Sequence, residues 1–170
     1  MDEQNPYRGP DAAVAELSSG DELAGRGTRL GAAIIDGIIL LVIISPLAYV
    51  GGYWQAAMAA AQSGQQVGFG TTLMWVVIGF VVFAVVQGFP LNATGQTWGK
   101  KLLKIKIVDL AGNKPPLGRL LALRYLPVQI VGVVPLLGWL VQIVEVLLIF
   151  RNDRRCGHDL IAGTKVVHAD

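Results

Sequence analysis

Apolar residues occur along this chain in runs long enough to cross a lipid bilayer. Leu30 to Val50 is apolar apart from Asp36 and one Ser-Pro pair, so it supplies about the 20 residues that span a hydrocarbon core of about 30 Å. Thr72 to Leu91 is a second such run, which only Gln87 interrupts and which Pro90 closes. The pattern predicts transmembrane helices over residues 30–50 and 72–91.

A third apolar stretch runs from Leu117 to Phe150. It is too long for one ordinary span and short for two, and Pro135 lies near its middle with a glycine on either side. Proline ends or kinks a helix because it has no N–H group. We therefore expect two short helices, over about residues 120–134 and 136–150, which cross at a tilt or form a re-entrant pair. The fold class that follows is all-α and polytopic, with a four-helix transmembrane bundle.

Two other segments have the character of β-strands. Residues 104–109 alternate polar and apolar side chains and lead into a turn-rich Ala-Gly-Asn, and residues 164–168 are a suitable partner. Pairing would let each segment cover the other's edge, which predicts a small cytoplasmic β-hairpin-like element. The acidic first 25 residues lack the apolar core of a signal peptide. We expect a disordered tail over residues 1–25 and a transmembrane domain over residues 26–170.

Composition agrees with lipid as the main solvent. Hydrophobic residues make up 53% of the chain and charged residues 15%, whereas soluble domains have about 25% charged residues. The net charge of +2 is too small for a nucleic-acid binder. Cys156 has no second thiol for a disulfide or a cysteine-rich zinc site, and neither Ser45 nor Ser63 has a base beside it in sequence. We expect no enzyme activity, no cofactor and no metal site, and interpret His158-Asp159 as a turn clamp.

The lysine and arginine residues lie in segments that can all face the same side of the membrane. They precede the first span, follow the second and follow the last apolar run, whereas Gly51 to Thr71 carries no charge. Basic residues near span ends are retained in the cytoplasm. Both termini are therefore expected on the cytoplasmic side of a bacterial inner membrane, with four crossings rather than three. These basic residues are Arg26, Arg29, Lys100, Lys101, Lys104, Lys106, Lys114, Arg119, Arg151, Arg154, Arg155 and Lys165.

Three ionisable residues lie within the apolar runs and enter from the expected cytoplasmic side. Asp36, Arg124 and Glu145 are within about two turns of a span end, so they should reach a common depth and meet. An unpaired charge there costs about 3 kcal/mol. Arg124 neutralised by one carboxylate would only fix helix packing. Two carboxylates competing for one arginine would leave one acid to exchange protons, as a proton-coupled cation site requires.

At these residues the sequence resembles the RDD family of small membrane proteins, named for one arginine and two aspartates. Arg29 follows Gly-Thr, Asp36 ends Ala-Ile-Ile-Asp, and Asp159 lies in Gly-His-Asp-Leu-Ile-Ala-Gly-Thr-Lys-Val-Val. Residues in the middle of the chain resemble the family's middle block; they are 95–101, 106–109 and 119–124. The resemblance covers about residues 25–167 and implies that Arg29, Asp36 and Asp159 are signature positions. Some members of the family are reported to act as sodium(potassium)/proton antiporters.

We therefore expect exchange of Na⁺ or K⁺ for H⁺. Asp36 would be the exchangeable carboxylate, Glu145 its helper and Arg124 the counter-charge. Arg29 and Asp159 would form an interfacial latch between the first span and the C-terminal segment.

A second hypothesis is a membrane adaptor that does not transport. Its sheet and basic face would dock a partner or anionic lipid, since each basic residue near the surface contributes about 1 kcal/mol. A transporter should show a hydrated cavity reaching Asp36, and an adaptor should show Asp36 fully paired. The small residues Ala33 and Gly37 allow a close helix contact within the fold or between copies. The expected partners are thus the bilayer, the exchanged ions and a second copy, but not nucleic acid.

Overall fold

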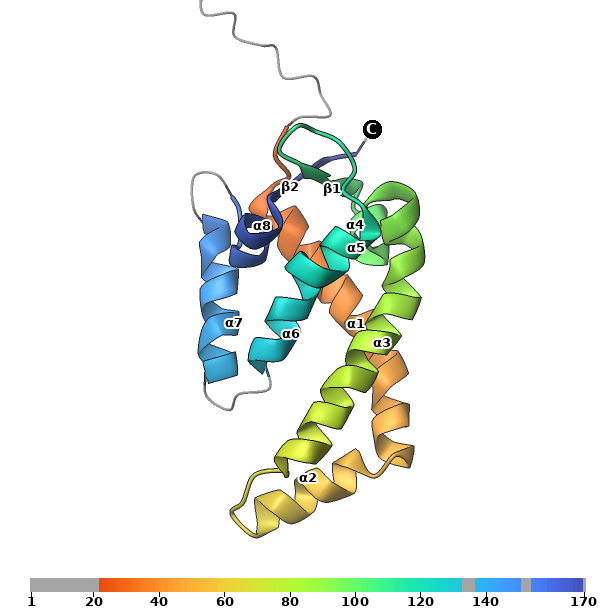
Figure 1. Cartoon of the computed structure of the whole chain (residues 1–170), viewed down its shortest axis with the longest axis vertical. Coiled ribbons are helices and arrows are strands. Elements are labelled where there is room, and N and C mark those ends of the chain that lie inside the picture. Colours follow the sequence, from red (N-terminus) through yellow and green to blue (C-terminus); the bar gives the residue numbers. More distant parts are fainter. Residues whose placement is uncertain (1–21, 133–136, 151–153, 170) are drawn as a thin grey trace, which may run out of the picture.

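Two long helices form the frame of the structure, a computed structural model that describes residues 22–132, 137–150 and 154–169. Helix α1 spans Arg26–Val50 and helix α3 spans Phe69–Thr94 (Figure 1). Both are long and apolar enough to cross a membrane, and only 6% of each apolar window is buried. Surfaces this apolar and this exposed suit lipid and not water. Both predicted runs are therefore confirmed as helices of spanning length; α1 begins earlier than expected and ends at Val50 as expected, and α3 is longer than expected at both ends.

Helix α3 continues through Pro90, where the sequence pattern predicted its end. Proline cannot donate to the carbonyl four residues earlier, which is that of Val86. The indole Nε1 of Trp98 takes the place of the missing donor, at 2.8 Å from the Val86 oxygen. The helix ends instead at Gly95, whose φ of 71° is left-handed and therefore suits glycine.

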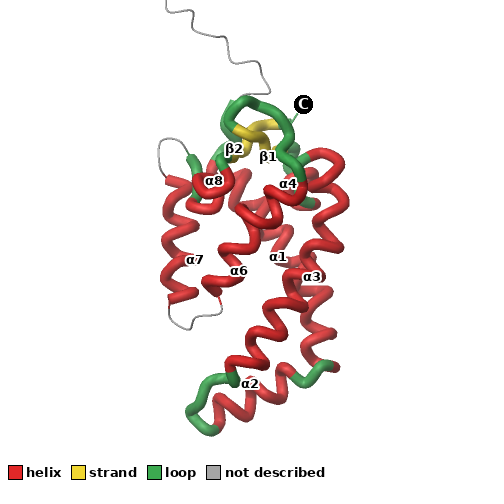
Figure 2. The backbone as a smooth tube through the Cα atoms, viewed as in Figure 1, coloured by secondary structure: helices red, strands yellow, loops and turns green. Residues whose placement is uncertain are grey.

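The uncharged segment between the long helices contains a helix that the sequence pattern did not predict. Helix α2 spans Tyr53–Gln62 and lies at the ends of α1 and α3 that are far from the sheet (Figure 2). The ring centroid of Tyr53 is 5.6 Å from that of Trp75. Aromatic rings at this end fit a membrane–water interface.

The third apolar stretch forms two short helical segments. Helix α5 (Leu117–Arg119), the π-helical turn η2 (Leu120–Tyr125) and helix α6 (Leu126–Gly132) follow one another without a break. Pro127 stands just after the wide turn, and because it has no N–H group, the carbonyl of Leu123 lacks its usual helical donor. The wide turn is thus a local consequence of the sequence.

Helix α7 (Leu137–Leu147) and the 3₁₀ turn η3 (Leu148–Phe150) form the second segment, and α7 packs beside α6 (Figure 1). At 1.5 Å per residue each segment is about 20–24 Å long, shorter than the hydrocarbon core. The chain is therefore mostly helical with two helices of spanning length, and the four-helix bundle stays a prediction. The expected break at Pro135 lies outside the described residues.

The predicted partnership of the two strand segments is confirmed. Strands β1 (Ile105–Asp109) and β2 (Thr164–His168) pair antiparallel, although they are far apart in sequence and no hairpin turn joins them. Residues 22–24, which composition assigned to the disordered tail, extend this sheet: the Ala24 N–H donates to the Val166 oxygen at 3.0 Å. Residues 1–21 of that tail lie outside the described residues. Both described ends of the chain therefore lie at one end of the helices.

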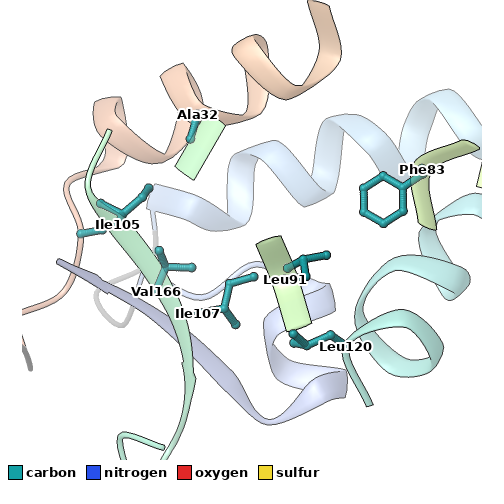
Figure 3. Close-up of a cluster of buried hydrophobic side chains, with 8 residues drawn as sticks. Ala32, Phe83, Leu91, Ile105, Ile107, Leu120 and Val166 are labelled. Carbon is teal, nitrogen blue, oxygen red and sulfur yellow. The ribbon is translucent and has the colours of Figure 1, made fainter. Parts of the chain in front are cut away.

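A small apolar core lies between the sheet and the helix ends (Figure 3). Its buried members are Ala24, Ala32, Phe83, Leu91, Ile105, Ile107, Leu120 and Val166. Two short helices flank it, α4 (Trp98–Leu102) against α1 and α8 (Gly157–Ala162) against η2. These two contacts bring polar residues from four parts of the chain to the same end of the molecule. Ala33 and Gly37, by contrast, are exposed on α1.

Candidate functional site

Asp159 is the point at which three distant segments meet. One of its oxygens accepts from Arg29 of α1 and the other from Arg124 of η2. All three side chains are buried, with exposed fractions of 0% for Asp159, 6% for Arg29 and 2% for Arg124. We call this group the Asp159 clamp. It brings together Arg29 and Asp159, the expected latch, and adds Arg124, which was expected beside Asp36 and Glu145.

Local structure around helix α8 holds Asp159 in position. The Thr164 hydroxyl donates to one carboxylate oxygen at 3.1 Å, and the Cys156 N–H donates to the other at 3.2 Å. The second contact is typical of a capping box, in which the side chain at the third helical position accepts from the N–H of the N-cap residue. Burial alone would raise the pKa of Asp159, but the guanidinium of Arg124 leads the charges that outweigh burial and hold this pKa well below its usual range. The carboxylate therefore stays ionised.

Asp36 of α1 lies in a second polar cluster, which we call the Asp36 site. Its Oδ1 accepts from Gln87 Nε2 at 2.9 Å and from the Gly99 N–H at 2.7 Å. Its Oδ2 accepts from the Thr97 hydroxyl at 2.5 Å, and Lys100 Nζ lies 3.9 Å from it. Only 13% of the Asp36 side chain is exposed. Both oxygens of this mostly buried carboxylate thus have hydrogen-bond partners.

Glycine at position 99 allows α4 to approach so closely. A Cβ there would lie 2.3 Å from the Ala32 carbonyl oxygen and 3.0 Å from the Asp36 carboxylate, so a larger residue would force the helices apart. Gln87 completes the connection, because its Oε1 accepts from the Trp98 N–H at 2.9 Å. One amide side chain thus links α3 to α4 and to Asp36.

Lys100 of the Asp36 site also interacts electrostatically with the three residues of the Asp159 clamp, and 12% of its side chain is exposed. Burial and then the charge of Arg124 lower its pKa to about 8; Asp36 and Asp159 oppose this shift, and Arg29 adds to it. The basic side chains of the two clusters outnumber the carboxylates by one. Lys100 is consequently the group that can give up a positive charge near neutral pH.

Glu145 lies apart from both clusters. Its Oε2 is 2.9 Å from His158 Nδ1 and accepts from the His158 N–H at 3.4 Å. The expected meeting of Asp36, Arg124 and Glu145 at one depth is therefore not the arrangement seen in the described residues. The physical reason is α8, which folds back beneath the helices and supplies nearer partners, Asp159 for Arg124 and His158 for Glu145.

Comparison with known proteins adds to this geometry. The sequence profile described as the RDD family matches residues 23–163. The chain belongs to the RDD family. This RDD protein is 30% identical over 148 residues to "Uncharacterized protein YckC" of Bacillus subtilis (strain 168), covering 86% of this chain and 85% of that one. It is 32% identical over 95 residues to an "Uncharacterized protein" of Haemophilus influenzae, covering 54% of this chain and 56% of the relative. None of the solved structures gives a significant match.

The three residues that the family resemblance singled out divide between the two clusters. Arg29 and Asp159 belong to the clamp, while Asp36 belongs to the site that α4 covers. Family membership and two apolar helices together make it a membrane protein. Sequence reasoning placed Thr97 and Lys100 in the segment 95–101 that resembles the family's middle block but gave neither a role, because Lys100 stands among other basic residues.

Proposed function

We propose that the Asp36 site exchanges a monovalent cation, Na⁺ or K⁺, for a proton across the membrane. The observation that carries the proposal is the place of the Lys100 ammonium, 3.9 Å from Asp36 Oδ2 and 3.5 Å from Thr97 Oγ1. A monovalent cation in the position of that ammonium would meet the same two oxygen atoms. The lysine charge and the cation would therefore compete for one carboxylate.

Charge balance gives the order of events. Protonated Lys100 neutralises Asp36, and when Lys100 releases its proton to water, the carboxylate takes up a cation in its place. The lowered pKa of Lys100, about 8, allows this release near neutral pH. One cation replaces one proton, so the charge of the site does not change. Arg124 acts here through its charge on Lys100, and Glu145 has no part in the step.

The proposal includes an orientation. The exposed lysines that follow α3 and both described chain ends lie at the sheet end, whereas the α2 end carries no charge. Cytoplasmic segments of membrane proteins are enriched in lysine and arginine. We infer that the sheet end faces the cytoplasm of a bacterial cell and that the Asp36 site opens there first.

Proteoliposomes test the exchange. Protein reconstituted with a pH-sensitive dye in the lumen should move protons when a Na⁺ or K⁺ gradient is imposed. Asp36→Asn removes the carboxylate that binds the cation, and Lys100→Gln removes the charge that competes with the cation, so each should lower the initial rate by at least about tenfold. Lys101→Gln is the matched control, because Lys101 is exposed on the same helix and lies over the Trp98 ring. Full activity in either site variant, or a wild type that moves no protons, would refute the proposal.

A second function is favoured by the full pairing of Asp36. A carboxylate that already accepts from Gln87, Thr97 and Gly99 stabilises the packing of α4 on α1, which is what a membrane adaptor needs. Such an adaptor would bind anionic lipid through the exposed basic residues that follow α3. These are Lys101, Lys104, Lys114 and Arg119.

Nanodiscs distinguish this function from exchange. An adaptor for anionic lipid should be more stable to heat in phosphatidylglycerol than in phosphatidylcholine, because several cations then face anionic headgroups. Replacing the four basic residues by glutamine should remove the difference, and the wild type should move no protons in proteoliposomes. Equal stability in both lipids would exclude the adaptor function.

A further inference from the structure

Three side chains with different metal-binding atoms meet where α7 faces the start of α8. The Glu145 carboxylate, the Cys156 thiol and the His158 imidazole each offer a ligand atom, and these atoms all lie within 4.8 Å of one another. The closest pair is Glu145 Oε2 and His158 Nδ1, 2.9 Å apart. The proposed exchange uses none of the three.

These donor atoms fit a zinc-class dication in type and in spacing. Zn²⁺ binds thiolate, imidazole and carboxylate at about 2.0–2.3 Å in a tetrahedron, so its donor atoms lie about 3–4 Å apart. The present separations reach that geometry through shifts of about 1 Å or less. Three protein ligands leave the fourth position to water or to an added ligand.

The surroundings of the three side chains also suit a metal. Gly157 separates Cys156 from His158, and a Cβ there would lie 2.5 Å from Glu145 Oε1, so glycine lets the carboxylate reach this position. The second ring nitrogen of His158, Nε2, lies 3.8 Å from Asp159 Oδ2. A carboxylate on the far side of a ligating imidazole is a common means of orienting it.

An ordinary structural explanation accounts for the parts separately. Glu145 and His158 form a hydrogen-bonded pair, and the Cys156 sulfur is a buried neighbour of Arg29, 3.8 Å from its Nη2. That explanation needs no thiol beside the pair and no glycine between Cys156 and His158. The convergence of oxygen, sulfur and nitrogen on one point is what it leaves unexplained.

We propose that Glu145, Cys156 and His158 bind a transition-metal dication of the zinc class. Binding breaks the S–H bond of Cys156, forms a sulfur–metal bond and releases the proton to water. The bound ion would tie α7 to α8, and through α8 to the Asp159 clamp.

The absorption spectrum of bound Co²⁺ tests this set of ligands directly. The full-length protein, free of any histidine tag and in detergent, should bind about one Co²⁺ per chain and develop a thiolate-to-cobalt charge-transfer band that Zn²⁺ abolishes. The chain has 1 cysteine, so the band identifies Cys156. Cys156→Ser should remove the band, and Glu145→Gln and His158→Gln should each weaken Zn²⁺ binding by at least about tenfold. His168→Gln, at the other of the 2 histidines, is the matched control and should bind like the wild type.

A folded wild type without the band would overturn the proposal, and so would wild-type Zn²⁺ affinity in Glu145→Gln and His158→Gln. Alkylation gives a measurement that needs no variant. Equimolar Zn²⁺ should slow the reaction of Cys156 with a maleimide by at least about tenfold, and an unchanged rate would contradict metal binding. Neither measurement depends on cation–proton exchange, so the two proposals stand or fall separately.

Discussion

The Asp159 carboxylate accepts from two buried guanidinium groups, so its loss leaves both charges without this counter-charge. We expect Asp159→Asn, which is nearly identical in shape, to lower the free energy of unfolding by about 3–5 kcal/mol, the range for breaking a buried ion pair. Thermal unfolding in detergent measures the loss. Glu22→Gln, at an exposed acid, should change stability by less than about 0.5 kcal/mol. An Asp159→Asn protein as stable as that control would contradict the role of the clamp.

Buried Lys100 gives the protein a specific dependence of stability on pH. Its pKa is about 8 in the folded protein and its ordinary value is 10.5, so between these values the unfolded chain binds more protons at this residue. The contribution of Lys100 to stability is therefore lowest below about pH 8 and rises as the pH increases toward 10.5. Unfolding midpoints at a pH of about 7.5 and about 9.5 should show this rise in the wild type and not in Lys100→Gln. Equal changes in both proteins would contradict the burial of this charge.

At the scale of residues, the sequence predicts which side chains need partners but not which partners they find. Arg29, Asp36 and Asp159 are recognisable because a charge beside or within an apolar run is costly when unpaired. Lys100 is not recognisable, since it stands among lysines that resemble ordinary surface. Only the close packing of Gly99 against α1 buries it, and that packing depends on segments far apart in sequence.

At the scale of elements, we expect Trp98 and Pro90 to be energetically coupled, because the Trp98 indole donates to the Val86 carbonyl that Pro90 leaves without its helical donor. Trp98→Phe keeps an aromatic ring but removes the donor to the Val86 oxygen, and should lower the free energy of unfolding by about 1 kcal/mol. In a Pro90→Ala background the alanine N–H restores the ordinary helical bond, so the same change should have almost no effect. A double-mutant cycle measures this coupling, and additive effects would contradict it.

The two spanning helices were predictable because length and apolarity suffice to indicate them. The end of α3 was not, because a rule about proline cannot anticipate that Trp98 supplies the missing donor. Helix α2 was missed for a different reason: the segment 51–71 was judged by its lack of charge, although its run of alanines favours a helix. The strand pair was found because alternation of polar and apolar residues is a strong signal even in short segments.

At the scale of the whole molecule, the basic sheet end and the uncharged α2 end define a direction across the membrane. Alkaline phosphatase fused after Asp170 should be inactive and green fluorescent protein fused there should fluoresce, because the sheet end is expected in the cytoplasm. Fusions after Gly64, beyond α2, should give the opposite pair of results. Active phosphatase after Asp170 would contradict this orientation.

The position of α8 decides the electrostatics of the whole molecule, and the sequence does not predict it. Counting turns from the span ends treated each helix as independent and brought Asp36, Arg124 and Glu145 to one depth. A helix as short as α8 has little periodicity from which to infer its place. Its return to the sheet end of the helices, beside strand β2, gave Arg124 and Glu145 the partners they have.

The most direct test of the central claim is proton release on cation binding. Purified protein in weakly buffered detergent at a pH of about 7.5 should release up to about one proton per chain when NaCl or KCl is added, because cation binding at Asp36 and protonation of Lys100 are linked. A bulky organic cation should release none. The release should vanish in Asp36→Asn and Lys100→Gln and persist in Lys101→Gln. A wild type that releases no proton, or a Lys100→Gln variant that releases as much as the wild type, would contradict the account.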